Sequence, residues 1–171
     1  MEVPLHADLS NLTFLLGSWE GGGRGEYPTI DPFDYDEEIE IEHVGDSFLL
    51  YDQSSWLSTD RSPLHFERGF IRPGPDPNEV ELCLAHPLGL TEIAHGVLDG
   101  TTIEISTDRD GVVGRTRSGS AVKHLSRRYE VERDILTYEL FMETDGTPMT
   151  LHLRGTPVSY THLTMPTILR V

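Results

Sequence analysis

Glycine recurs at alternate positions near the start of this 171-residue chain, in a run that reads Gly17-Ser-Trp-Glu-Gly-Gly-Gly-Arg-Gly-Glu-Tyr-Pro28, with glycine at 17, 21, 23 and 25. A period of two is the side-chain period of a β-strand, so the run predicts a strand. Without side chains on one face, such a strand lets another backbone or a flat ligand come close. A phosphate-binding loop is disfavoured, because the glycine spacing does not match a dinucleotide fingerprint and no Gly-Lys-Ser/Thr ending follows.

Length and composition predict one globular domain with its own core. No run approaches the roughly 18 apolar residues of a membrane span, and the N-terminus lacks the basic start of a signal peptide, so we expect a cytoplasmic protein that does not insert into membranes. The net charge of −16, from 13 basic and 29 acidic residues, argues against a nucleic-acid partner. Cys83 is the only cysteine, which excludes an internal disulfide and a thiolate metal cluster.

Short runs rich in β-branched and aromatic residues fill the chain after residue 16, separated by turn sequences such as Asp99-Gly100 and Asp145-Gly146. With the glycine strand there are ten, the others spanning 38–44, 47–56, 65–72, 79–85, 91–98, 102–107, 121–131, 135–142 and 149–155. So many short strands with almost no helix predict a closed antiparallel meander. We expect a ten-stranded up-and-down β-barrel of the fatty-acid-binding-protein-like (calycin) type, with a β-sandwich as the alternative.

One short helix is predicted before the first strand, over residues 8–16, with Asp8 or Ser10 as the N-cap. A cluster of acidic residues follows the glycine strand. Its last members, Glu38, Glu40 and Glu42, alternate with isoleucines as on a strand with one wet face, and a calcium site is the rival interpretation.

The end of the chain resembles one reading frame of the transposon-end adapter that is used to prepare sequencing libraries. The segment begins at Val158 and reads Val-Ser-Tyr-Thr-His-Leu-Thr-Met-Pro-Thr. We therefore expect a β-barrel domain over residues 1–157 and a non-native tail over 158–171, the alternative being a genuine tail. On this interpretation Tyr160 and His162 take no part in any site.

Eight histidines are present, but none has the spacing of a helical zinc motif, and no hydrolase triad is indicated by local sequence. A cofactor is the better candidate for carrying chemistry. Strand periodicity places His152 on the same face as Thr150 and Arg154, which is typical of the solvent side of a strand.

The spaced pattern G-x-W-x-G-x-G-x-G-x-Y-P, with Thr29 and Ile30 after it, resembles the nitrobindin family of small haem-binding β-barrels. Further matching motifs follow in the same order, covering about residues 10–157. They include Pro63-Leu64-His65-x-Glu67-x-Gly69-Phe70, His86-Pro87-x-Gly89-x-Thr91-Glu92, and Pro148-Met149-x-x-His152-Leu153.

This resemblance implies one haem b per chain, ferric in the resting state, in a shallow site with an open distal position. It implies isomerisation of peroxynitrite to nitrate and reversible binding of nitric oxide, in a chain that forms a homodimer. By the same resemblance His152 is the axial iron ligand, through which the catalytic chemistry runs. Candidates for the rest of the haem site are Thr29, Ile30 and His65 as pocket lining, Gly21 and Gly23 at the porphyrin edge or in close strand packing, and Lys123 or Arg154 at the propionates.

Two alternatives remain open. The same barrel architecture serves carriers that enclose fatty acids or other small apolar ligands in the lumen. A haem-based carrier or sensor of nitric oxide, with incidental isomerase activity, is the second. An axial histidine and retained haem would exclude the first.

Overall fold

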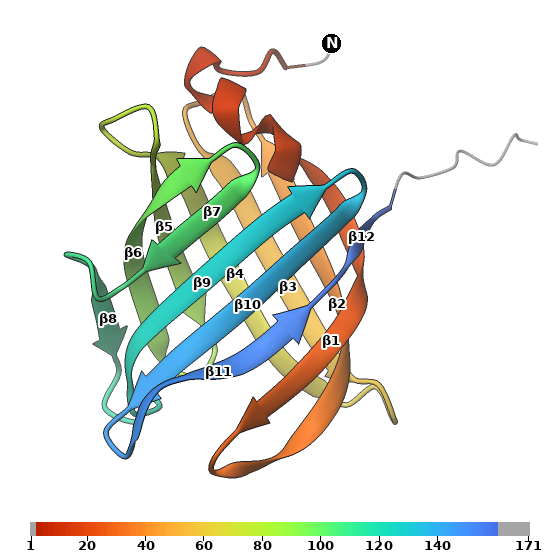
Figure 1. The fold of residues 1–171 in the computed structure, drawn as a ribbon, viewed down its shortest axis with the longest axis vertical. Coiled ribbons are helices and arrows are strands. Elements are labelled where there is room, and N and C mark those ends of the chain that lie inside the picture. The colour runs from red at the N-terminus through yellow and green to blue at the C-terminus, as the bar shows by residue number, and fades with distance from the viewer. Residues whose placement is uncertain (1–2, 161–171) are drawn as a thin grey trace, which may run out of the picture.

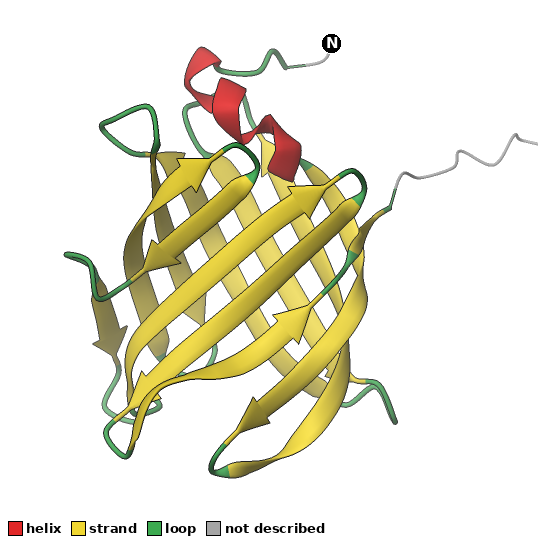
Figure 2. Cartoon of the chain, in the orientation of Figure 1, coloured by secondary structure: helices red, strands yellow, loops and turns green. Residues whose placement is uncertain are grey.

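The computed structural model describes residues 3–160, which form one closed β-barrel with a short helix at one end (Figures 1 and 2). The elements in chain order are η1 (Ala7–Leu15), β1 (Gly17–Tyr27), β2 (Ile30–His43), β3 (Leu49–Leu57), β4 (Pro63–Pro73), β5 (Glu79–His86), β6 (Leu90–Asp99), β7 (Thr102–Ser106), β8 (Val112–Arg115), β9 (Val122–Glu132), β10 (Ile135–Thr144), β11 (Thr147–Gly155) and β12 (Val158–Ser159). No helix in this described part of the chain is both long and apolar enough to cross a membrane.

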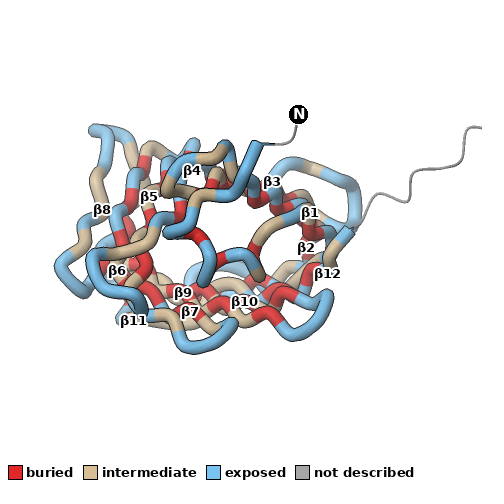
Figure 3. Tube along the Cα trace, turned by 90° about the horizontal axis from the view of Figure 1, so that it is seen from above, coloured by how far each residue is buried: buried red, intermediate tan, exposed pale blue. Residues whose placement is uncertain are grey.

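The strands occupy ten positions around the barrel, and all the pairings are antiparallel. β7 and β8 share one position, because β6 pairs with β7 along His95–Asp99 and with β8 along Leu90–Ile93. β11 and β12 likewise share the position between β1 and β10. The view along the barrel in Figure 3 shows the strands closing into a ring. The predicted ten-stranded barrel is therefore confirmed.

The predicted N-terminal helix is present as a 3-10 helix that covers one end of the barrel. Leu9, Leu12 and Leu15 are all buried, and their spacing of three places them on one side of a helix with three residues per turn. The cap prediction was wrong: His6 is the N-cap, because its Nδ1 accepts a hydrogen bond from the Asp8 amide at 3.3 Å.

The glycines of β1 allow the wall of the barrel to pack closely. A Cβ at Gly23 would collide with the Tyr35 hydroxyl, and one at Gly25 with the ring of Phe33. A Cβ at Gly21 would lie 2.6 Å from the Cα of Pro157. The bare face of β1 therefore gives space to aromatic rings of β2 and to the chain after β11.

The acidic segment divides between the two faces of β2. Glu38, Glu40 and Glu42 are exposed and alternate with buried Ile39 and Ile41, as predicted. Glu37, in contrast, lies on the inner face and is 2% exposed. Its inward position follows from strand parity, but a carboxyl group is unusual inside a barrel.

The barrel interior contains two apolar clusters. The larger lies towards η1 and includes Leu9, Leu12, Ile39, Ile41 and Leu136. The smaller, at the opposite end, consists of Leu90, Val122, Leu125 and Leu140, with Val113, Met142 and Leu153 packed against it. The predicted inward row of β10 spans both clusters, through Leu136, Tyr138, Leu140 and Met142.

The proposed non-native tail starts inside the described chain and continues outside it. Its first residues, Val158 and Ser159, form β12, where the Ser159 amide donates to the Asp134 carbonyl at 2.7 Å. The Tyr160 amide donates to the Ser18 carbonyl at 2.7 Å. Residues 161–171, including His162, lie outside the described residues.

Two truncations test separately the contribution of residues 158–160, which form strand hydrogen bonds, and that of residues 161–171. Removing residues 161–171 should leave the melting temperature unchanged, because a tail derived from an adapter, as we propose, would not have been selected to pack. Removing residues 158–171 should lower the free energy of unfolding by about 1–3 kcal/mol, since the strand hydrogen bonds of Ser159 and Tyr160 are lost. Thermal and urea unfolding measure both. An equal loss from the two truncations would contradict this division of the tail.

Candidate functional site

A cavity of about 240 Å³ is lined by residues that include Ile30, Leu64 and Leu88. These residues stand at or beside the turns that lie at the end of the barrel opposite η1 (Figure 1). The rim of the cavity carries exposed apolar side chains, with Ile30 46%, Leu64 37% and Leu88 49% exposed. Deeper walls are formed by Phe33, Leu90, Val122, Leu125, Leu140, Met142 and Leu153. Such walls favour a flat or compact apolar ligand.

The floor of the cavity is a polar layer that crosses the barrel between the two apolar clusters. On β9 and β6 the charged residue stands at an inward position between residues of the two clusters. Arg127 of β9 lies between the inward-facing Leu125 and Tyr129, and Glu92 of β6 lies between Leu90 and Ala94. The layer consists of Glu37, Gln53, Glu67, Glu92, Arg127 and Tyr138, with His86 and Tyr51 in contact with them.

Arg127 joins the charged half of this layer. Its Nη2 donates to Glu67 Oε2 at 3.0 Å and its Nη1 contacts Glu92 Oε1 at 2.5 Å. The side chains of all three residues are at most 4% exposed. Burial alone would raise the carboxyl pKa values of Glu67 and Glu92, but Arg127 and the neighbouring histidine side chains hold both below their ordinary range. Both carboxyls are therefore ionised, and a single guanidinium lies between two negative charges.

The other half of the layer is a hydrogen-bonded chain around the Glu37 carboxyl. The Tyr138 hydroxyl donates to Glu37 Oε2 at 2.7 Å, and Gln53 Nε2 donates to the same oxygen at 2.5 Å. Tyr51 connects the halves, since its hydroxyl contacts Gln53 Oε1 at 2.7 Å and Glu67 Oε1 at 3.2 Å. Burial raises the pKa of Glu37 to about 7, against the opposing effect of these donors.

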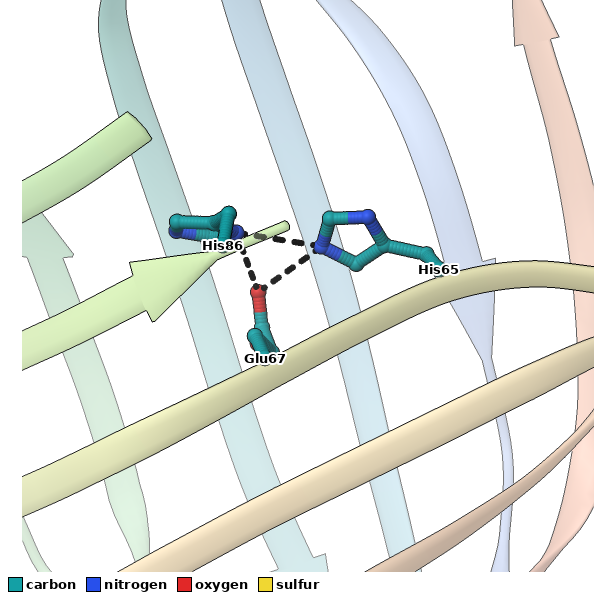
Figure 4. Close-up of side chains that lie close together, drawn as sticks. All are labelled: His65, Glu67 and His86. Carbon is teal, nitrogen blue, oxygen red and sulfur yellow. Dashed lines mark hydrogen bonds and ion pairs between the residues drawn. The ribbon is translucent and has the colours of Figure 1, made fainter. Parts of the chain in front are cut away.

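Two histidines stand at the edge of the layer and line the cavity. His65 Nε2 lies 3.1 Å from His86 Nδ1, and His86 Nε2 lies 3.1 Å from Glu92 Oε1 (Figure 4 shows the two rings with Glu67). His65 comes from the start of β4 and His86 from the end of β5. His65 was predicted to line the pocket, whereas His86 was not singled out.

A β-bulge explains how His152 reaches the cavity wall. Along β10 and β11, Leu140 pairs with Leu153 but Phe141 pairs with Leu151, so His152 is an extra residue in the ladder. A bulge changes the direction of a side chain, and both His152 and Leu153 line the cavity. Strict alternation would have placed His152 on the outer surface.

The imidazole of His152 is held by a backbone carbonyl. Nδ1 lies 3.1 Å from the carbonyl oxygen of Glu26, just beyond the last β1–β11 pair, Gly25 with Leu153. A carbonyl only accepts, so Nδ1 carries the proton and Nε2 of the neutral ring carries the free lone pair. Burial lowers the pKa of His152, which favours the neutral form, and the ring of Tyr27 packs edge-on at 5.5 Å.

Of the pocket-lining residues and glycines that were predicted for the haem site besides His65, one lines the cavity and three do not. Ile30 lines the cavity with His65 and His152. Thr29 lies in the exposed turn between β1 and β2 and is not part of the lining, and neither are Gly21 and Gly23.

The two predicted propionate partners are engaged elsewhere. Lys123 pairs with Glu143 at 3.2 Å, and Arg154 pairs with Glu139 at 2.9 Å. Both are exposed and neither lines the cavity.

Comparison with known proteins matches residues 8–156 to the model of the THAP4-like, heme-binding beta-barrel domain. The chain belongs to this family. Its relatives include "Peroxynitrite isomerase" of Nocardia farcinica, 43% identical over 155 residues, and "Peroxynitrite isomerase 2" of Mycobacterium ulcerans, 44% identical over 155 residues. These alignments cover 90% of this chain and 92% and 95% of the two relatives.

A solved structure shares the fold. The crystal structure of Rv2717c from M. tuberculosis superposes with a TM-score of 0.87 at 42% identity, over 92% of this chain and all of the other. The motifs of the sequence predicted membership of the nitrobindin family of haem-binding β-barrels, and the match to the THAP4-like, heme-binding beta-barrel domain confirms this prediction.

The residues present fit a haem. His152 offers an unprotonated Nε2 at the wall of a cavity whose sides are aliphatic and aromatic. The volume of about 240 Å³ lies below the roughly 300–1,000 Å³ of enclosed ligand sites, so part of so large a group would extend through the mouth. The apolar rim of Ile30, Leu64 and Leu88 would lie against that part.

Removal of the central cation should destabilise the barrel strongly. Arg127→Met leaves Glu67 and Glu92 buried without their partner, and we expect a loss of about 3–5 kcal/mol in the free energy of unfolding. Arg154→Met is the matched control, because its pair with Glu139 is exposed and should contribute under about 1 kcal/mol. Urea unfolding measures both. Similar losses in the two variants would contradict the central role of Arg127.

The buried Glu37 carboxyl should lower the free energy of unfolding as the pH rises from about 4.5 to 7. Its pKa is about 7 in the folded chain and ordinary in the unfolded chain, so the folded state binds more protons between pH 4.5 and 7. Relative to Glu37→Gln, the parent chain should be equally stable near pH 4.5 and less stable by about 2–3 kcal/mol at pH 8. Urea unfolding across this range measures the difference, and a constant gap would count against a protonated Glu37.

Proposed function

We propose that this chain binds haem b through His152 and isomerises peroxynitrite to nitrate. The observation that carries the proposal is the bulge-directed His152, whose Nδ1 is bound to the Glu26 carbonyl and whose Nε2 is free at the wall of an apolar cavity. Membership of a haem-binding barrel family and relatives named peroxynitrite isomerase support it. When bound, a ferric haem supplies a Lewis acid and the redox chemistry of iron.

The contacts of His152 determine how it would act as an axial ligand. The bond to the Glu26 carbonyl fixes the tautomer and the ring orientation, and a hydrogen-bonded Nδ1–H makes an imidazole a stronger donor to iron. The edge-on Tyr27 ring restricts rotation, and the Tyr27 hydroxyl is itself anchored by donating to the Met142 carbonyl at 3.1 Å. The ligand is thus positioned before the cofactor arrives.

The cavity walls would contribute by retaining reactive fragments. Isomerisation requires that the two parts of a broken O–O bond recombine before one of them diffuses away. Aliphatic side chains such as Leu90, Leu125 and Leu140 exclude water and offer no group that reacts with nitrogen dioxide. The polar floor closes the inner end of the cavity, which leaves the mouth as the route of exchange.

Three finer statements belong to the same proposal. The resting iron is ferric, nitric oxide binds reversibly to the same haem, and one haem binds per chain because the cavity that His152 lines is a single one.

We also propose that the chain forms a homodimer. An apolar row on the outer face supports this proposal. In it, neighbouring residues pair across five adjacent strands: Leu50, Phe70, Cys83, Ile93 and Val112. Phe70, Ile93 and Val112 are 43%, 43% and 53% exposed.

A carrier of small apolar ligands is the alternative function on fold grounds. The apolar walls suit such a ligand, but the binding of an apolar ligand does not require an oriented imidazole with a free nitrogen lone pair. A nitric-oxide carrier or sensor would keep the haem and differ only in its reactivity.

His152→Ala should abolish retention of haem while the barrel stays folded. The variant loses the axial bond, whereas the strand loses one half-buried side chain. The Soret absorption after haem addition and gel filtration measures retention. Lys123→Ala, which alters a basic residue outside the cavity lining, is the control and should bind haem normally. An unchanged histidine-ligated spectrum in His152→Ala would disprove the ligand assignment.

The ferric holoprotein should speed the decay of peroxynitrite, shift the product towards nitrate and protect free tyrosine from nitration. Stopped-flow traces and nitrotyrosine yields measure these effects, with apoprotein and haem-supplemented His152→Ala as controls. Cyanide should suppress the effect, because a strong ligand blocks the reactive coordination position. Equal decay rates and equal nitration with holoprotein and apoprotein would favour the carrier or sensor.

A further inference from the structure

Three side chains at the inner end of the cavity bring one ligand atom each to a common point (Figure 4). His65 Nε2 lies 3.1 Å from His86 Nδ1 and 3.5 Å from Glu67 Oε2, and His86 Nδ1 lies 3.3 Å from the same oxygen. The three atoms form a nearly equilateral triangle. Glu67 and His86 are buried, and His65 is 27% exposed in its side chain.

The size of the triangle matches a tetrahedral metal site. Zinc binds imidazole nitrogen at about 2.0–2.1 Å and carboxylate oxygen at about 2.0–2.2 Å, and tetrahedral angles then place ligand atoms about 3.3–3.5 Å apart. The observed edges of 3.1, 3.3 and 3.5 Å lie close to that range. An octahedral ion with similar bond lengths would draw the atoms closer, to about 3.0 Å.

The atoms behind the triangle are arranged as they are behind bound metals. His86 Nε2 faces Glu92 Oε1 at 3.1 Å, so its proton is donated to a carboxylate while Nδ1 keeps its lone pair for the common point. Glu67 is oriented from the other side by Arg127, whose Nη2 donates to Oε2 at 3.0 Å. Both ligands are thus fixed by partners on other strands.

Hydrogen bonding without a cation leaves one contact unexplained. With both rings neutral, His86 Nδ1 accepts from His65 Nε2–H, because His86 Nε2 donates to Glu92. Glu67 Oε2 then faces the same Nδ1 lone pair at 3.3 Å, which is a contact between two acceptors. The two carboxylates also exceed the single guanidinium by one negative charge. A proton on His86 Nδ1 or a metal cation at the common point would resolve both, and metal titration distinguishes the two.

We propose that His65 Nε2, His86 Nδ1 and Glu67 Oε2 bind one zinc ion, whose fourth position opens to the cavity. Two imidazoles and one carboxylate with a fourth position left open are the donor set of a catalytic zinc site. The cavity is the entry path, since all three residues line it. The fourth ligand is water or a small anion, and the ion adds positive charge in a chain of net charge −16.

This site shares no residue with the proposed haem ligation. The zinc proposal can therefore be tested independently of the proposed haem function. A readout of metal binding needs neither haem nor peroxynitrite.

The test uses the full chain without haem, treated with a chelator and desalted. Isothermal titration with zinc chloride gives stoichiometry and affinity, and cobalt(II) absorption reports geometry, because tetrahedral cobalt absorbs far more strongly than octahedral cobalt in the visible range. His65→Ala and Glu67→Gln each remove one ligand, and the second preserves size. The control, His95→Ala, removes a half-exposed histidine beside Glu81. Thermal melting confirms that each variant folds.

We expect one zinc per chain, a tetrahedral cobalt spectrum, and affinity reduced about 100-fold or more in His65→Ala and in Glu67→Gln. His95→Ala should bind zinc as the parent chain does. Zinc should raise the melting temperature of the parent chain and not that of Glu67→Gln. Absence of binding, an octahedral cobalt spectrum, or unchanged affinity in a folded ligand variant would overturn the proposal and leave the three side chains as a hydrogen-bonded network.

Discussion

The ion pairs of Arg127 with Glu67 and Glu92 are the interaction on which the rest of this barrel depends. A closed ten-stranded barrel lined only by large apolar side chains would fill with packed core. Here charged residues from β4, β6 and β9 meet inside, and each must keep its partner because burial of an unpaired charge is costly. The layer therefore separates a packed half under η1 from a hollow half that is open to ligands.

The functional end of the barrel is organised by a second constraint, the bulge in β11. One extra residue in the ladder brings His152 and Leu153 to the same cavity, which two consecutive residues of a regular strand cannot share. The Glu26 carbonyl, beyond the last β1–β11 pair, then binds Nδ1. Backbone geometry on two strands thus determines which imidazole nitrogen is available for chemistry.

Most of the fold could be predicted from the sequence, because period-two alternation and turn residues mark nearly every strand. β8 and β12, of four and two residues, were missed because such short runs carry no periodic signal. The spacing of Leu9, Leu12 and Leu15 predicts a helix, but its 3-10 form and His6 cap are revealed only by the structure.

The site was less accessible to sequence reasoning. Alternation pointed His152 outward, since a bulge leaves no mark in the pattern, and the resemblance to a haem-binding family carried the assignment instead. The polar layer was missed for a related reason. A single charge in a strand, such as Arg127 or Glu92, is typical of a wet face, and only barrel closure shows that these residues face one another. Lys123 was chosen for its charge, yet it pairs with Glu143 and does not line the cavity.

The most direct test of this account is a crystal structure of the haem-loaded chain. We expect a bond from Nε2 of His152 to the iron, with Nδ1 of the same ring still within hydrogen-bond distance of the Glu26 carbonyl and the Arg127 ion pairs intact on the inner side of the haem. Iron bound by His65 or His86, or bound by Nδ1 of His152 with the Glu26 contact broken, would contradict this account.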